Sequence, residues 1–102
     1  MVNENIKPSN DFAVPYYAYA TMSAVSVAAN SYVNKTLTFS SSVSWSKIVI
    51  TAEFQANGAM VNITPYSDTV AYVTVVNHKT SAISGTLRVR ALMPANVTMS
   101  LS

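Results

Sequence analysis

Between residues 24 and 93 the chain is a series of short runs in which apolar and polar positions alternate, and the polar positions are almost never charged. The runs cover residues 24–29, 35–39, 47–54, 59–64, 70–76 and 86–92. A period of two puts successive side chains on opposite faces of a β-strand, one buried and one facing water. Turn residues separate the runs, and no helical periodicity lies between them. The pattern therefore predicts an all-β domain, an antiparallel sandwich or barrel.

Asn57 and Gly58 stand between two of these runs, which is the sequence signature of a type I′ hairpin turn. In such a hairpin Phe54 faces Val61, and the register brings the apolar side chains of both strands to one face. The predicted core face holds Ile48, Ile50, Ala52, Phe54, Val61 and Ile63, and the outer face holds Thr51, Glu53, Gln55, Met60, Asn62 and Thr64.

The run at residues 70–76 is different because it is apolar at both odd and even positions. Such a run is typical of a strand that is buried on both faces. We interpret the second covered face as a contact with a neighbouring subunit.

Antiparallel succession of the strands sorts the loops into two ends. Loops at 41–46, 66–68 and 94–96 share the end where the N-terminal segment enters, and loops at 30–34, 57–58 and 77–85 share the far end. Residues 1–20 are predicted to be a tether or strand leading from a stalk, with residues 21–102 as the sandwich. Within the tether, Pro15 opens the aromatic stretch at 16–19, which is either a short strand or a clasp along the domain edge.

Composition narrows the function classes. At 102 residues the chain forms one domain, and only a tenth of its residues are charged, with a net charge of +2. The six Lys and Arg residues are scattered, which disfavours nucleic acid as a partner. There is no Cys for disulfides or thiolate metal sites, and no apolar run long enough for membrane insertion. The first residues lack the pattern of a signal peptide.

The sequence offers little for catalysis. Within the predicted sandwich the acids are Glu53, expected on an outer strand face, and Asp68, expected in a turn at the tether end. This separation disfavours the paired carboxylates of a glycosidase. His78 has no Gly-x-Ser-x-Gly partner motif, and no ligand spacing for a metal is present. We predict a protein that is not an enzyme and uses no cofactor or metal.

Four further side chains, those of His78, Trp45, Arg88 and Arg90, are candidates for structural or binding roles. His78 is either an ordinary residue beside a loop or a ligand contact at the far end. Trp45 is expected to be a lid over the core. Arg88 and Arg90 alternate with apolar residues and so share an outward face, as a solvated surface or as an inter-subunit contact.

The remaining surface is rich in Asn, Ser, Thr and Tyr. These side chains donate and accept hydrogen bonds and present flat aromatic area, which suits neutral sugars. Single sites of this kind are weak, and several copies on one assembly raise the apparent affinity.

In the order and spacing of its segments, the stretch at 22–93 resembles the H-type-lectin-like domains at the C-terminal tips of bacteriophage tail-fibre and receptor-binding proteins. The segments that carry the resemblance are AVSVAANSY at 24–32, KTLTF at 35–39, KIVIT at 47–51, VNIT at 61–64 and NHKTSAISGTLRVRAL at 77–92. The resemblance implies an antiparallel sandwich of six to seven strands that assembles as a homotrimer. It also implies a location in the virion tail, host cell-surface polysaccharide or glycan as ligand, and contact with other tail or baseplate proteins through the N-terminus.

One departure from that family concerns its last strand, which commonly carries a Trp-Ile-Ala element. This chain has Val-Arg-Ala-Leu at 89–92 instead, so sugar contacts tied to that Trp are not carried over. We therefore place the ligand site at the far end, on Asn30, Tyr32, Asn57, Asn77 and His78. Two alternatives stay open, a purely structural fibre or cap domain of the virion and a bacterial surface adhesion module.

Overall fold

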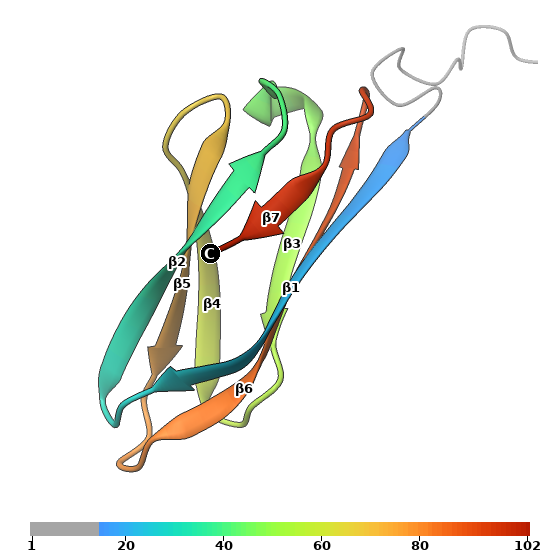
Figure 1. Ribbon diagram of the computed structural model, residues 1–102. Coiled ribbons are helices and arrows are strands. Elements are labelled where there is room, and N and C mark those ends of the chain that lie inside the picture. The colour runs from blue at the N-terminus through green and yellow to red at the C-terminus, as the bar shows by residue number, and fades with distance from the viewer. Residues whose placement is uncertain (1–14) are drawn as a thin grey trace, which may run out of the picture.

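The computed structural model describes residues 15–102, and this part of the chain forms two antiparallel sheets packed face to face (Figure 1). The strands and the single 3-10 turn, η1, are β1 (Tyr16–Val27), β2 (Ser31–Phe39), η1 (Trp45–Lys47), β3 (Val49–Phe54), β4 (Ala59–Pro65), β5 (Val70–Asn77), β6 (Ile83–Met93) and β7 (Met99–Leu101). The prediction of an all-β chain with antiparallel sheets is confirmed. No helix in the described region is long and apolar enough to span a membrane.

The two sheets differ in size. One has three strands in the order β1-β6-β3, and the other has four in the order β4-β5-β2-β7. The inward positions of both sheets form one core, whose fully buried members are mainly Val and Leu. Leu37, Val73 and Val75 line it from the four-stranded sheet, and Leu87 and Val89 line it from β6.

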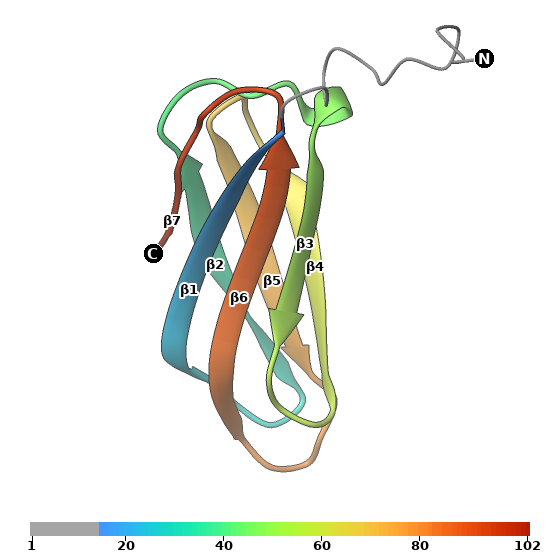
Figure 2. The same cartoon turned by 90° about the vertical axis from the view of Figure 1, so that its right-hand side faces the viewer.

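The predicted hairpin at Asn57–Gly58 is wrong. β3 pairs with β6 and β4 pairs with β5, so the link between β3 and β4 crosses from one sheet to the other (Figure 2). A type I′ turn needs positive φ at both central residues. Gly58 has it, with φ of 84°, but Asn57 does not. The backbone N–H of Gln55 instead donates to the carbonyl of Thr86 on β6, at 3.1 Å.

The predicted faces of these two strands are nevertheless correct. Phe54 is buried, and the other predicted core residues are partly buried against the core, namely Ile48, Ile50, Ala52, Val61 and Ile63. The predicted outer residues are exposed. Which side chains of a strand point inward depends on its alternation of apolar and polar residues, so it stays the same when the strand pairs with a different partner.

The aromatic stretch at 16–19 is the start of β1, so the strand interpretation is confirmed over the clasp. β1 pairs with β6 from Tyr16 to Val27, with a bulge between Met22 and Val25, where Ala24 has φ of 58°. β1 runs across the proposed boundary at residue 20, and Ala18 is buried in the core. The rest of the proposed tether, residues 1–14, lies outside the described residues.

The sorting of the loops into two ends is confirmed (Figures 1 and 2). At the far end Asn30 N–H donates to the Lys79 carbonyl at 2.9 Å. At the other end, where β1 begins, Val43 N–H donates to the Asp68 carbonyl at 2.8 Å. Successive strands run in opposite directions whether the link stays within a sheet or crosses between sheets, so parity alone places the loops.

Trp45 closes the core at the end where β1 begins, as predicted. Its ring meets Phe39 edge-on, with centroids 5.4 Å apart, and its Nε1–H donates to the Ser67 carbonyl at 2.8 Å. A Trp at the edge of a core usually packs its apolar ring over the core and finds a hydrogen-bond partner for its N–H.

Candidate functional site

The structure brings four of the five predicted ligand residues to the far end as exposed side chains. Asn30 and Asn57 lie in the β1–β2 and β3–β4 links, Tyr32 stands on the outer face of β2, and His78 follows β5. The His78 N–H donates to the Gly58 carbonyl at 3.4 Å, which ties two of these links together. Their role as ligand contacts stays a prediction.

Asn77 is the exception because its side chain is fully buried. Its Nδ2 donates to the carbonyls of Val27, Ala28 and Ser81 at 3.2, 3.1 and 2.9 Å, and its Oδ1 accepts from the Lys79 N–H at 2.9 Å. Every polar atom of the amide is therefore used within the protein. Asn77 holds the β1–β2 and β5–β6 links together and offers nothing to a ligand.

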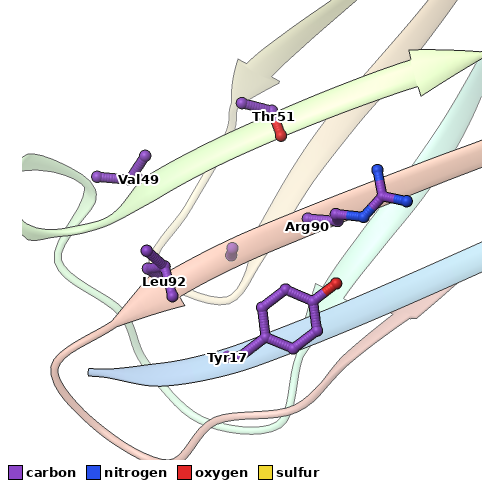
Figure 3. Close-up of a pocket in the computed structure, with 6 residues that line it drawn as sticks. Tyr17, Val49, Thr51, Arg90 and Leu92 are labelled. Atoms are coloured by element: carbon purple, nitrogen blue, oxygen red, sulfur yellow. The ribbon is translucent and has the colours of Figure 1, made fainter. Parts of the chain in front are cut away.

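A better-formed candidate site lies on the outer face of the three-stranded sheet. The pairing of β1, β6 and β3 aligns Tyr17, Leu92 and Val49 in one cross-strand row. The next row is Tyr19, Arg90 and Thr51. Side chains of both rows border an open groove of about 250 Å³ (Figure 3). We call it the Tyr17 groove, lined by Tyr17, Val49, Thr51, Arg90, Ala91 and Leu92.

The groove is apolar at one end and polar at the other. Tyr17 is 61% exposed and Val49 54%, so both side chains are accessible to a ligand. With Leu92 they form the apolar end, and Arg90 and the hydroxyl of Thr51 form the polar end (Figure 3). An exposed apolar patch beside a few convergent polar groups is a typical feature of ligand sites.

Arg90 is held in place from two sides. Its Nη1 donates to Oε1 of Glu53 on β3, and its guanidinium lies 5.5 Å from the centre of the Tyr19 ring on β1. The hydrogen bond and the charge of Arg90 lower the pKa of the Glu53 carboxyl, and Glu53 in turn raises the pKa of Arg90. The pKa of Tyr19 is also lowered, first by a hydrogen bond with Thr21 and then by Arg88.

The outward placement of both arginines is confirmed, since Leu87 and Val89 between and beside them are buried. What the sequence interpretation missed is the partner of Arg90. The predicted hairpin places Glu53 beside β4, whereas in the structure β3 lies beside β6. The available signals were the apolar residues at the outward positions Val49 and Leu92, where a solvated strand would carry polar groups.

We expect the pKa of Glu53 to depend mainly on Arg90. A carboxyl pKa below its ordinary value of 4.5 means that the ion pair contributes stability above the unfolded-state pKa. That contribution is lost as the pH falls through the folded-state pKa. The pKa of the Glu53 carboxyl, measured by NMR titration, is expected to rise strongly in Arg90→Leu and only slightly in the matched variant Arg88→Leu. Equal shifts in the two variants would contradict the pairing.

The two acidic side chains among residues 15–102 lie on different sheets or their links. Glu53 lies on the outer face of the three-stranded sheet, whereas Asp68 lies in the β4–β5 loop of the other sheet. Among residues 15–102 no group of three or more His, Cys, Asp and Glu side chains is placed to hold a metal ion. The groups at the groove are a phenol ring, a hydroxyl and a salt-bridged guanidinium.

Comparison with models of protein families, with curated proteins and with solved structures gives no match to this chain. The resemblance to the H-type-lectin-like domains of phage tail fibres therefore stays a prediction.

Proposed function

We propose that this chain is a non-catalytic recognition domain that binds a neutral saccharide in the Tyr17 groove. The observation that carries the proposal is the exposed Tyr17 ring beside an apolar floor and next to the Arg90–Glu53 ion pair. A pyranose ring has an apolar C–H face and a rim of hydroxyl groups. The groove offers a counterpart to each of these two parts.

The apolar end covers the sugar face that water solvates poorly. Tyr17 supplies flat area with few rotatable bonds, and Val49 and Leu92 extend it. At the other end the guanidinium of Arg90 donates hydrogen bonds, and the Thr51 hydroxyl both donates and accepts, which matches sugar hydroxyls that do both. Because the two charges of the ion pair offset each other, the site favours an uncharged ligand over an anion.

The fixed position of Arg90 helps a shallow site. Its contacts with Glu53 and Tyr19 limit the motion of the side chain before any ligand arrives. Less rotamer entropy is then lost on binding. One open groove of this size still gives weak affinity, so useful retention requires several copies on one assembly.

The wider biological role in the proposal follows the resemblance. It is that of a tip domain of a phage tail fibre or receptor-binding protein, displayed on the virion, that attaches to host cell-surface polysaccharide. Its N-terminal segment joins it to other tail proteins, and the assembly of three copies is the oligomeric state that the resemblance implies.

The test compares two tyrosines that are both 61% exposed, Tyr17 in the groove and Tyr32 at the far end. We expect Tyr17→Ala to weaken the binding of a soluble oligosaccharide about tenfold or more. The comparison is the stacking of a nucleobase on an aromatic side chain, a contact of similar size that is worth about 1–3 kcal/mol. Tyr32→Ala combined with His78→Ala is expected to leave it within twofold. A panel of neutral bacterial polysaccharides in affinity electrophoresis selects the ligand, and NMR titration gives the per-site Kd.

Each other outcome is decisive. Loss of binding only in the Tyr32 and His78 double variant would move the site to the far end. Retention by no polysaccharide of the panel would contradict carbohydrate recognition and favour the structural role in the virion.

A further inference from the structure

The sandwich is closed along one side and open along the other. On the side of β1, β2 and β7, the inward residues Val25, Val27, Leu37 and Phe39 are buried. On the side of β3 and β4, the inward residues Ile50, Ala52, Val61 and Ile63 remain partly exposed. They border an open cleft of about 420 Å³ between the two strands, with Trp45 at one end.

Both strands that flank this cleft are sheet edges, because β3 is bonded only to β6 and β4 only to β5. An edge strand presents unpaired N–H and C=O groups that can pair with another chain. Proteins block such pairing with charged side chains, Pro, bulges or short strands. The edges of this chain differ in how well they are blocked.

Among the sheet edges of the described residues, β1, β2, β3 and β7 each carry a blocking feature. β1 has the bulge between Met22 and Val25, and β7 is three residues long. Where β2 extends beyond β7, Lys35 occupies an inward position and is only partly buried. β3 carries the charged Glu53. β4, with the sequence AMVNITP at 59–65, has no charge and pairs with β5 residue for residue without a bulge, and its one blocking residue, Pro65, stands at its last position.

We propose that β4 pairs with β4 of a second copy of this chain, antiparallel across a two-fold axis centred on Asn62. Asn62 is the middle residue of the strand. The register then sets Val61 opposite Ile63 of the other copy on the cleft side. On the outer side it sets Met60 opposite Thr64, and Asn62 opposite itself.

This register is self-complementary. Apolar side chains meet apolar ones toward the clefts, and the outer side brings together only uncharged groups. A two-fold axis perpendicular to the sheet keeps inner faces inward, so the four-stranded sheets join into one continuous sheet. The merged clefts cover Ile50, Val61 and Ile63, the core residues that a single copy leaves partly exposed. A second copy therefore supplies hydrogen-bond partners for the edge strand and an apolar cover for the cleft.

The contact is independent of the Tyr17 groove, which lies on the outer face of the other sheet. It joins copies in pairs, whereas the resemblance implies three copies, so the mass of the assembly separates the two ideas. Because each copy contributes one seven-residue strand and the cleft beside it, we expect association that depends on concentration.

The test uses Asn62→Lys, an exposed position where the two copies would bring like charges together. Sedimentation equilibrium from micromolar to millimolar protein is expected to show a dimer for the unaltered chain. The variant is expected to dimerise about tenfold more weakly, because like charges directly opposite repel. Ser26→Lys adds the same charge at an exposed position on β1 and is expected to change nothing. Mixing Asn62→Lys with Asn62→Glu is expected to restore dimers as mixed pairs.

Thermal unfolding of the variants checks that each is folded. A chain that stays monomeric throughout the range, or an assembly that Asn62→Lys leaves unchanged, would overturn the β4 contact. Saccharide binding at the Tyr17 groove is measured per site, so its result is read separately from the mass.

Discussion

Replacing Asn77 with Leu is expected to lower the free energy of unfolding by about 3 kcal/mol, since each buried polar group left without a partner costs about 1–3 kcal/mol. Asn77 is fully buried and its amide donates to the carbonyls of Val27, Ala28 and Ser81. Leu is close in size but supplies no donor, so these carbonyls and the Lys79 N–H lose a partner. Urea unfolding measures the loss, and for a domain of this size the melting temperature should fall by roughly 15 °C.

A matched pair of variants isolates the amide from the volume. Asn77→Asp keeps the shape and the acceptor for Lys79 N–H but replaces the donating nitrogen with an oxygen that faces three carbonyls. We expect a loss of stability at neutral pH that is partly recovered in acid, where the protonated carboxyl donates again. Asn57→Asp, exposed at the same end, is expected to stay within about 0.5 kcal/mol. A loss below 1 kcal/mol in Asn77→Leu would show that the amide network is dispensable.

The burial of Asn77 also shows what the sequence pattern contained and what was overlooked. The inward positions of β5 are Ala71, Val73 and Val75, and the period of two continues to Asn77. The structure thus gives Asn77 an inward side chain, whereas from the sequence it is placed among the exposed ligand residues of the far end. Strand periodicity is a better guide than residue polarity where a strand ends, because a buried amide is tolerated once it is hydrogen-bonded.

The local sequence pattern correctly predicted which side chains of each strand point inward and at which end each loop lies. It did not predict which strands pair with each other. Phe54 and Val61 were placed inward correctly, although their strands belong to different sheets. Facing is set by each strand's own alternation, whereas pairing depends on contacts between residues far apart in the chain. Asn57–Gly58 is a turn signal within either kind of link, and the backbone hydrogen bond from Gln55 N–H to the Thr86 carbonyl is a long-range contact that the local pattern does not predict.

The same limit explains why the Tyr17 groove could not be predicted. It requires β6 to lie between β1 and β3, which brings Arg90 beside Tyr19 and Glu53. No sequence feature specifies that strand order. The sequence also predicts that both faces of β5 are buried, whereas in a single copy of the chain its outer side is only half-buried. Val70 to Val76 alternate between buried inward and half-buried outward positions, so burial of the outer side by a neighbouring subunit stays a prediction.

Gly85 on β6 lies against the backbone of the β3–β4 link at Gln55. A Cβ at Gly85 would stand 2.5 Å from the carbonyl oxygen of Gln55 and 3.2 Å from the ring edge of Phe54. The obstacle is backbone, which moves only if the link itself moves. At Gly58, by contrast, a Cβ meets side-chain carbons of Lys79 at 2.7 and 2.8 Å, and the difficulty is the φ of 84°.

We therefore expect Gly85→Ala to lower the free energy of unfolding by about 3 kcal/mol, at the upper end of the range for overpacked sites. The added methyl forces the link away from β6 and weakens the bond from Gln55 N–H to the Thr86 carbonyl. Gly58→Ala is expected to cost about 1–2 kcal/mol, the usual penalty for a left-handed Ala, because the Lys79 side chain can turn aside. Ser84→Ala, at the exposed neighbouring position, should stay within about 0.5 kcal/mol. Urea unfolding of the three variants gives their order, and faster amide exchange at Gln55 in Gly85→Ala alone would locate the strain. If Gly85→Ala were no more destabilising than Ser84→Ala, the β3–β4 link would have room to relax, and the crossing between the sheets would not depend on this glycine.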